Sequence, residues 1–168
     1  MIIFETTIEG VSGPALERFA RLAQRLARVS GKVDILIAGD RRLHQLNRRF
    51  RGKDNATDVL SFPRHRDSNA GGDIAISADY ARRNARRHGH SHEDELKILI
   101  LHGMLHLAGH DHESDSGEMA RLEARLRRRL KLPASLTERV VSLRLPDVSP
   151  SRSRPTRLAR ASKPGRSR

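Results

Sequence analysis

The chain has 168 residues, of which 36% are hydrophobic and 32% are charged, a composition that suits one modest core plus an extension. It contains no cysteine, which excludes a disulfide framework and a thiolate metal site, so any metal ligands must be His, Asp or Glu. No apolar run approaches the roughly 20 residues of a membrane-spanning helix, and the first residues lack the pattern of a signal peptide. We therefore expect a soluble, cytoplasmic protein.

The formal net charge of +13 favours an anionic partner, and nucleic acid is the first candidate. Residues 151–168 contain seven Arg or Lys and no acidic residue, so removing them from the total leaves +6 on residues 1–150. From about Pro146 the chain is rich in Ser, Pro and Arg, which predicts disorder. We expect a compact domain over residues 1–132 and a basic tail over 133–168, which is either a solubilising extension or an RNA-binding arm.

Hydrophobic periodicity and capping signals predict alternating strands and helices, followed by a helical half. In the first half we expect a strand over 2–8, a helix from residues 12–14 to Gly31, a strand over 33–38 and a helix over 41–50. Two short strands over 59–62 and 74–76 follow. The last three elements are a helix capped by Ser77 or Asp79 that ends near His88, a helix from Ser91 to about Gly109, and a helix over 116–130. The helix that begins at Ser91 is apolar on nearly every side, which predicts a buried position. This order favours an α+β or layered α/β domain with one small sheet.

Residues 102–112 read HGMLHLAGHDH and contain a candidate metal site. His102 and His106 are four residues apart, so a helix places them on one face, one turn apart. Gly109 permits a left-handed turn that reverses the chain and returns His112 to the same place. Three imidazole ligands with an open fourth position are typical of a catalytic zinc site, although nickel or cobalt would also fit three histidines.

The spacing of the three histidines is also that of the metzincin proteases. Those enzymes have a glutamate directly after the first histidine, where it acts as general base, whereas this chain has Gly103. A zinc metalloprotease is therefore the second interpretation. A third is a non-enzymatic, zinc-containing ribosome-binding protein.

The remaining histidines are weaker candidates. We expect His110 to line the site and Asp111 to orient a ligand imidazole. The other cluster lies beside Gly89 at a helix junction, where a solvated loop is the simpler interpretation. Its members are His88, His90 and His92.

A second motif, FRGKDNATDVLSFP over residues 50–63, places a basic loop before a short strand, where Arg51 could lie over a phosphate. Together with the histidine segment, this motif resembles the YbeY endoribonuclease family of bacterial rRNA maturation factors, over about residues 1–132. The resemblance rests on Leu46-Asn47, Phe50-Arg51, Thr57 to Pro63, Gly72 to Ile74, His102 to His112, Met119 and Glu123.

The resemblance implies a zincin-like α+β domain with a mixed sheet and one zinc ion on His102, His106 and His112. It implies cleavage of single-stranded RNA, in maturation of the 3′ end of small-subunit rRNA and in ribosome quality control, with rRNA and the small ribosomal subunit as partners. Arg51 matches the family's functionally important arginine, so we expect Arg51 and His102 to be catalytic. His110 departs from the family pattern, in which tyrosine is commoner.

The expected reaction is hydrolysis of a phosphodiester. A metal at the three histidines would polarise a phosphoryl oxygen or activate water, and Arg51 would neutralise charge on the phosphate. The sequence identifies no general base, so attack by water and attack by the 2′-hydroxyl both remain open.

Overall fold

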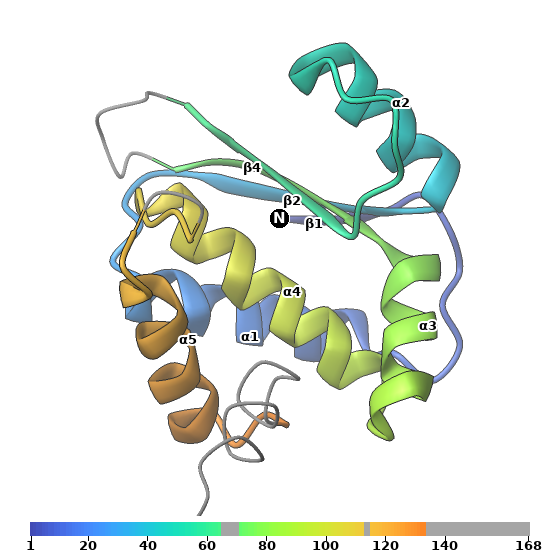
Figure 1. Ribbon diagram of the computed structural model, residues 1–168. Helices are drawn as coiled ribbons and strands as arrows, with labels where there is room; N and C mark the ends of the chain where they lie inside the picture. The colour runs from blue at the N-terminus through green and yellow to red at the C-terminus, as the bar shows by residue number, and fades with distance from the viewer. Residues whose placement is uncertain (65–70, 113–114, 134–168) are drawn as a thin grey trace, which may run out of the picture.

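The computed structural model describes residues 1–64, 71–112 and 115–133. Within these ranges the chain forms four strands and five helices (Figure 1). The strands are β1 (Ile2–Phe4), β2 (Val33–Ala38), β3 (Val59–Pro63) and β4 (Gly72–Ser77). The helices are α1 (Gly13–Leu26), α2 (Asp40–Arg51), α3 (Ala78–His88), α4 (His92–Leu107) and α5 (Glu118–Arg129). The predicted tail over 133–168 lies outside the described residues, except for Pro133.

The strands form one mixed sheet in the order β1-β2-β4-β3. Strands β1, β2 and β4 are parallel to one another, whereas β3 runs antiparallel to β4. Strand β3 is therefore one edge of the sheet and β1 is the other. A small mixed sheet covered by helices confirms the predicted α+β class.

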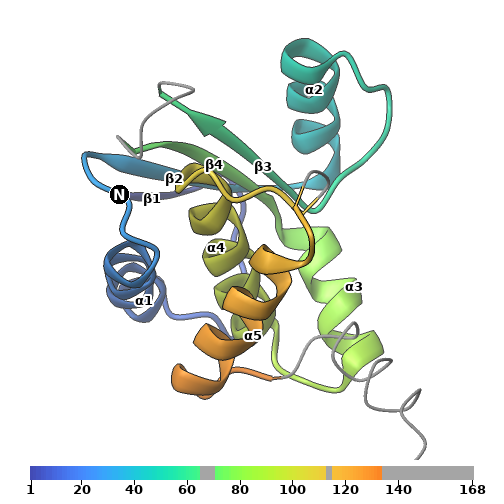
Figure 2. The ribbon, with the colours of Figure 1, turned by 60° about the vertical axis from the view of Figure 1, so that its left-hand side comes forward.

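The two faces of the sheet bury separate hydrophobic clusters because successive residues of a strand point to opposite faces. Ile35 and Ile37 belong to the larger core that α1 and α4 cover, whereas Ala38 belongs to a smaller cluster with Leu43 of α2. Figures 1 and 2 show α1 and α4 on one side of the sheet and α2 on the other. The edge strand β3 contacts both α4 and α2, so it separates two layers of helices.

Helix α4 is the centre of the domain, as its apolar sequence predicts. Its first turn is capped by Ser91, whose Oγ accepts a hydrogen bond from the backbone N–H of Asp94 at 3.0 Å. Burying each large aliphatic side chain contributes about 1.5–3 kcal/mol, so the helix is firmly held. The fully buried residues of α4 include Leu96, Ile100, Leu101 and Leu105. No helix in the described ranges is both long and apolar enough to cross a membrane.

Strand β1 is shorter than the predicted strand over 2–8. Its three residues pair with residues 35–37 of β2. Strand β1 has no second neighbour, because it lies at the edge of the sheet. The backbone N–H of Glu5 still donates to the carbonyl of Ile37 at 3.0 Å, after which the chain leaves the sheet. Ile8 instead packs against the larger core from a loop.

Helix α1 also ends before the predicted Gly31. Arg28 adopts a left-handed φ of +59°, which stops the helix. The side-chain amide of Gln24 donates to the carbonyls of Val29 and Gly31 at 3.2 and 2.8 Å and holds the turn that leads into β2.

Candidate metal centre

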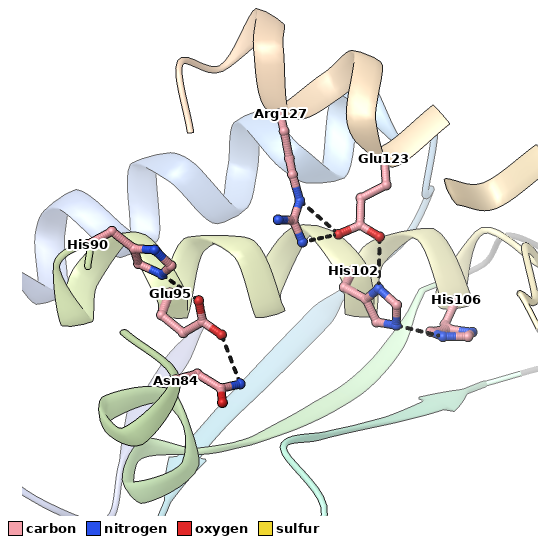
Figure 3. A network of polar contacts seen from close by, with 7 residues as sticks. All are labelled: Asn84, His90, Glu95, His102, His106, Glu123 and Arg127. Carbon is pink, nitrogen blue, oxygen red and sulfur yellow. Dashed lines mark hydrogen bonds and ion pairs between the residues drawn. The ribbon is translucent and has the colours of Figure 1, made fainter. Parts of the chain in front are cut away.

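The second half of α4 presents two imidazoles on one face. His102 and His106 are one helical turn apart, and their Nε2 atoms lie 3.1 Å from each other. Both side chains are half-buried at the end of α4 that lies beside β3. Figure 3 shows the two rings directed toward one another.

The chain reverses after α4 and brings a third imidazole back. Gly109 has a φ of +86°, the left-handed conformation that glycine adopts without strain, and the backbone N–H of His110 donates to the carbonyl of Leu105. The ring of His112 consequently lies 5.5 Å from that of His102 and 5.3 Å from that of His106, centroid to centroid. The structure thus brings together the three histidines that the spacing predicts.

These three histidines form a group that could hold a metal ion, because one ligand nitrogen from each lies within 4.8 Å of the others. Zinc–nitrogen bonds of about 2.1 Å in a tetrahedron require ligand atoms about 3.4 Å apart. The 3.1 Å between the Nε2 atoms of His102 and His106 is close to that separation. His112 is exposed, so the group opens toward solvent on the side of the returning loop.

Helix α5 orients the first of these imidazoles. Nδ1 of His102 lies 3.0 Å from Oε2 of Glu123, a carboxylate that accepts its proton in a hydrogen bond (Figure 3). In a neutral imidazole with that tautomer, Nε2 carries the lone pair that a metal would bind. Glu123 also accepts hydrogen bonds from Arg127, one of them from Nε at 2.9 Å. Although burial favours the neutral acid, these contacts with His102 and Arg127 keep the pKa of Glu123 below its usual value.

Glu123 belongs to the candidate site, and its role could not be predicted from the sequence. The resemblance marks it only as a matching position of the closing helix, without a role. Its separation of 21 residues from His102 gives no periodic signal, and only the packing of α5 against α4 brings the two together. The sequence near Glu123 indicates only an ion pair with Arg127, since the two residues are four apart on one helix face.

Burial and neighbouring charge keep His106 neutral. Desolvation is the main cause, and the adjacent His102 and His112 add to it, so the pKa of His106 falls to about 4. Asp111 opposes this shift. A neutral imidazole at pH 7 has a lone pair to offer a metal without first losing a proton.

A cleft of about 480 Å³ opens beside the three histidines and is lined by all of them. Its other walls come from the end of α2, the following loop, β3 and the returning loop after α4. Arg51, the predicted phosphate-binding arginine, lines this cleft together with Lys53. His110 and Asp111 also line it, in agreement with the prediction for His110.

A buried asparagine holds the basic wall of the cleft in place. Helix α2 ends at Gly52, whose φ is +67°, immediately after Arg51. The side-chain amide of Asn47, only 2% exposed, donates to both the backbone carbonyl and Oδ1 of Asn55 at 2.9 Å. This contact ties the loop that carries Lys53 back to α2, beside the cleft that Arg51 and Lys53 line.

Gly103 faces the sheet and not the cleft. A Cβ at this position would lie 2.9 Å from Cγ2 of Ile74 and 3.2 Å from Oγ of Ser61. The carbonyl of Gly103 accepts a hydrogen bond from the Ser61 hydroxyl at 3.2 Å. The absence of a side chain therefore allows α4 to approach β3 and β4 closely, and the position has no room for a glutamate.

The second histidine cluster is not the solvated loop that the sequence suggested. The side chains of His90 and Glu95 are 7% and 6% exposed, and Nε2 of His90 lies 2.6 Å from Oε2 of Glu95. Asn84 of α3 donates to the other carboxylate oxygen at 3.2 Å (Figure 3). The left-handed Gly89 turns the chain between α3 and α4 and directs His90 inward. His88, His90 and Glu95 also bring ligand atoms within 4.8 Å of one another.

Comparisons with known proteins agree with these features. The family model described as Endoribonuclease YbeY matches residues 5–131. The chain is 56% identical over 139 residues to the endoribonuclease YbeY of Koribacter versatilis, covering 83% of this chain and 91% of that protein. It is 55% identical over 130 residues to that of Solibacter usitatus, covering 77% and 86%. The solution structure of TM1509 from Thermotoga maritima matches with a TM-score of 0.51 at 30% identity, covering 74% of this chain and 85% of that one. The chain belongs to the endoribonuclease YbeY family.

Proposed function

We propose that the protein is a zinc-dependent endoribonuclease that cleaves single-stranded RNA. The observation that carries this proposal is the convergence of His102, His106 and His112 on one point of a cleft that Arg51 also lines. Family membership supports the class of reaction. The basic composition of the chain supports a polyanionic substrate.

The donor set fits zinc. Imidazole nitrogens are borderline ligands that zinc accepts readily, and Glu123 fixes the tautomer of His102 in the way that metal-bound histidines usually require. We assign His102, His106 and His112 as the ligands. A zinc ion held there would supply Lewis-acid chemistry to the phosphodiester.

Arg51 would bind the phosphate. Its guanidinium is always charged and can donate two parallel hydrogen bonds to phosphate oxygens. Lys53 lines the same cleft and would contact a neighbouring phosphate of the strand. Because charge accumulates on the phosphate during cleavage, Arg51 would stabilise the transition state more than the bound substrate. His102 is the second residue that we assign to catalysis, through the ion that it would hold.

We further propose that the substrate is rRNA of the small ribosomal subunit, at its 3′ end, and that the activity also serves ribosome quality control. An immature 3′ extension would offer the single strand that an open cleft can accept. Such a substrate places the activity in the cytoplasm and makes the small subunit the natural partner. The basic tail over 133–168 lies outside the described residues from position 134 onward.

A protease in the metzincin manner is disfavoured. Such an enzyme needs a glutamate at position 103, and a side chain there would collide with Ile74 instead of reaching the cleft. A purely structural zinc site is disfavoured because three protein ligands open onto a cleft, whereas structural sites have four.

The test compares the wild-type protein with the His106→Ala variant. We expect the wild type to contain zinc and to cleave a structureless RNA but not casein, and a chelator to abolish the cleavage. The variant should lose both zinc and cleavage while it keeps its circular dichroism spectrum. Unchanged RNA cleavage by a metal-free, folded His106→Ala protein would refute the proposal.

A further inference from the structure

One aromatic side chain is unusually exposed near the cleft. Phe50, in the last turn of α2, is 59% exposed, although burying a phenylalanine is worth about 1.5–3 kcal/mol. Its ring packs edge-to-face against Phe62 of β3, with centroids 5.3 Å apart and planes at 64°. The other exposed large hydrophobic residues of the described chain lie on or just before β1, at the opposite edge of the sheet, and are Met1, Ile3 and Phe4.

The Phe50–Phe62 pair adjoins residues that line the cleft, although neither phenylalanine lines it. Arg51, the neighbour of Phe50, lines the cleft, and so do Ser61 and Pro63 on either side of Phe62. Phe62 packs with the cluster on the α2 face of the sheet, whereas Ser61 contacts α4 on the other face. The aromatic pair is therefore separated from the histidines only by the edge strand β3, over which the end of α2 lies (Figure 1).

The surroundings of Phe50 are strongly basic. The guanidinium carbon of Arg49 lies 5.3 Å from the centroid of the Phe50 ring. Arg48 and Arg51 belong to the same helix turn, and Lys53 follows in the loop. An exposed aromatic ring among cations is the combination by which proteins bind single-stranded nucleic acid, with cations contacting phosphates and the ring contacting a base.

We propose that Phe50 is a stacking platform for a nucleobase of the RNA substrate. Phe62 contacts the Phe50 ring edge-to-face, and 59% of Phe50 remains exposed to a ligand. The strand would pass over β3, with one unpaired base on Phe50 and a nearby phosphate on Arg51. Because a base in a duplex has both faces covered, this subsite selects single strands. The inference rests on the proposed function in that the substrate is RNA.

The sequence offers a direct test, since the chain contains no tryptophan. The Phe50→Trp variant has a single indole at the platform, and Phe4→Trp is its matched control on β1, where Phe4 is 39% exposed. Both variants are titrated with a structureless oligoribonucleotide in the presence of chelator, which prevents cleavage, and binding is followed independently by the anisotropy of a labelled RNA. We expect saturable quenching of the indole fluorescence in Phe50→Trp, no quenching in Phe4→Trp, and no quenching of either variant by duplex RNA. Indole fluorescence that stays constant in Phe50→Trp while RNA binds would overturn the inference.

Substitutions that change the ring provide the second measurement. We expect Phe50→Leu to weaken binding of single-stranded RNA about tenfold and Phe50→Tyr to restore it, because stacking requires an aromatic face. Phe4→Leu should bind as the wild type does, and thermal unfolding checks that each variant is folded. If the wild type cleaves RNA but Phe50→Leu binds and cleaves equally well, the platform fails and the proposed function stands. If the wild type neither binds nor cleaves RNA, the proposed function itself fails.

Discussion

Glu123 and His102 are joined across the contact between α5 and α4 by a hydrogen bond of 3.0 Å from Nδ1 to the carboxylate. The bond sets the tautomer of His102 and turns its Nε2 toward His106, 3.1 Å away. Arg127 in turn holds Glu123. The closing helix α5 is thus part of the candidate metal centre, although it supplies none of the three histidines.

The Glu123 carboxylate should strengthen zinc binding by orienting His102. Glu123→Ala should therefore weaken zinc binding by about 10- to 100-fold, because His102 loses its acceptor. Glu123→Gln keeps an acceptor and should lose less. Competition with a chromophoric chelator measures the affinity. Glu118→Gln, at an exposed position of the same helix, is the control and should bind zinc as the wild type does. Equal affinities in all four proteins would remove Glu123 from the metal centre.

Arg51 should affect cleavage without affecting the metal. We expect Arg51→Ala to lower the rate of RNA cleavage by on the order of 100-fold, the usual loss when one donor to a developing charge is removed. Arg51→Lys keeps the charge but not the paired donors, so it should recover only part of the rate. Arg41→Ala, an exposed residue at the start of the same helix, serves as the control. Zinc content, measured in parallel, should be unchanged in all variants, and a loss of zinc from Arg51→Ala would contradict this division of roles.

The candidate site shows what a sequence can predict. The three histidines were predictable because their geometry is local: one helical turn and one glycine turn bring them together. Arg51 was found only through a motif, since nothing local relates position 51 to position 102. Glu123 and the burial of His90 were missed for a related reason, because each depends on how one helix docks against another. From its sequence, the polar segment around His90 is predicted to be exposed, because the sequence does not show that Glu95 is its buried partner.

Gly103 gives a prediction about packing. Gly103→Ala places a methyl group 2.9 Å from Cγ2 of Ile74, a core residue that is 1% exposed. Overpacking of a core costs about 1–3 kcal/mol, which exceeds the gain of roughly 1 kcal/mol from replacing a helical glycine. We therefore expect a lower free energy of unfolding in a denaturant titration. Because Ile74→Ala removes the colliding methyl, Gly103→Ala should be stabilising in that background, and additive effects of the two changes would contradict the collision.

The start of α2 should make stability depend on pH. The Asp40 carboxylate accepts hydrogen bonds from Arg83 at 2.7 Å and from Ser77. Burial alone would raise its pKa, but these bonds keep the pKa of Asp40 below the usual 3.8. Because the pKa of Asp40 is lower in the folded than in the unfolded protein, its ionised carboxylate stabilises the fold fully above about pH 4. This stabilisation is lost as the pH falls through the folded-state pKa. Asp40→Asn should therefore lower the melting temperature at pH 7, with a difference that shrinks toward pH 3.

The last prediction separates the two histidine clusters by counting metal ions. In the cluster at the α3–α4 junction, the Glu95 carboxylate already accepts a hydrogen bond from Asn84 and lies 2.6 Å from Nε2 of His90. We expect these contacts to satisfy it without a metal. Elemental analysis should give one zinc ion per chain in the wild type, one in His90→Ala and none in His106→Ala. His90→Ala should lower the free energy of unfolding by about 3 kcal/mol, because Glu95 loses its buried partner. Its melting temperature should fall accordingly. Two zinc ions in the wild type and one in His90→Ala would instead assign a metal to the second cluster.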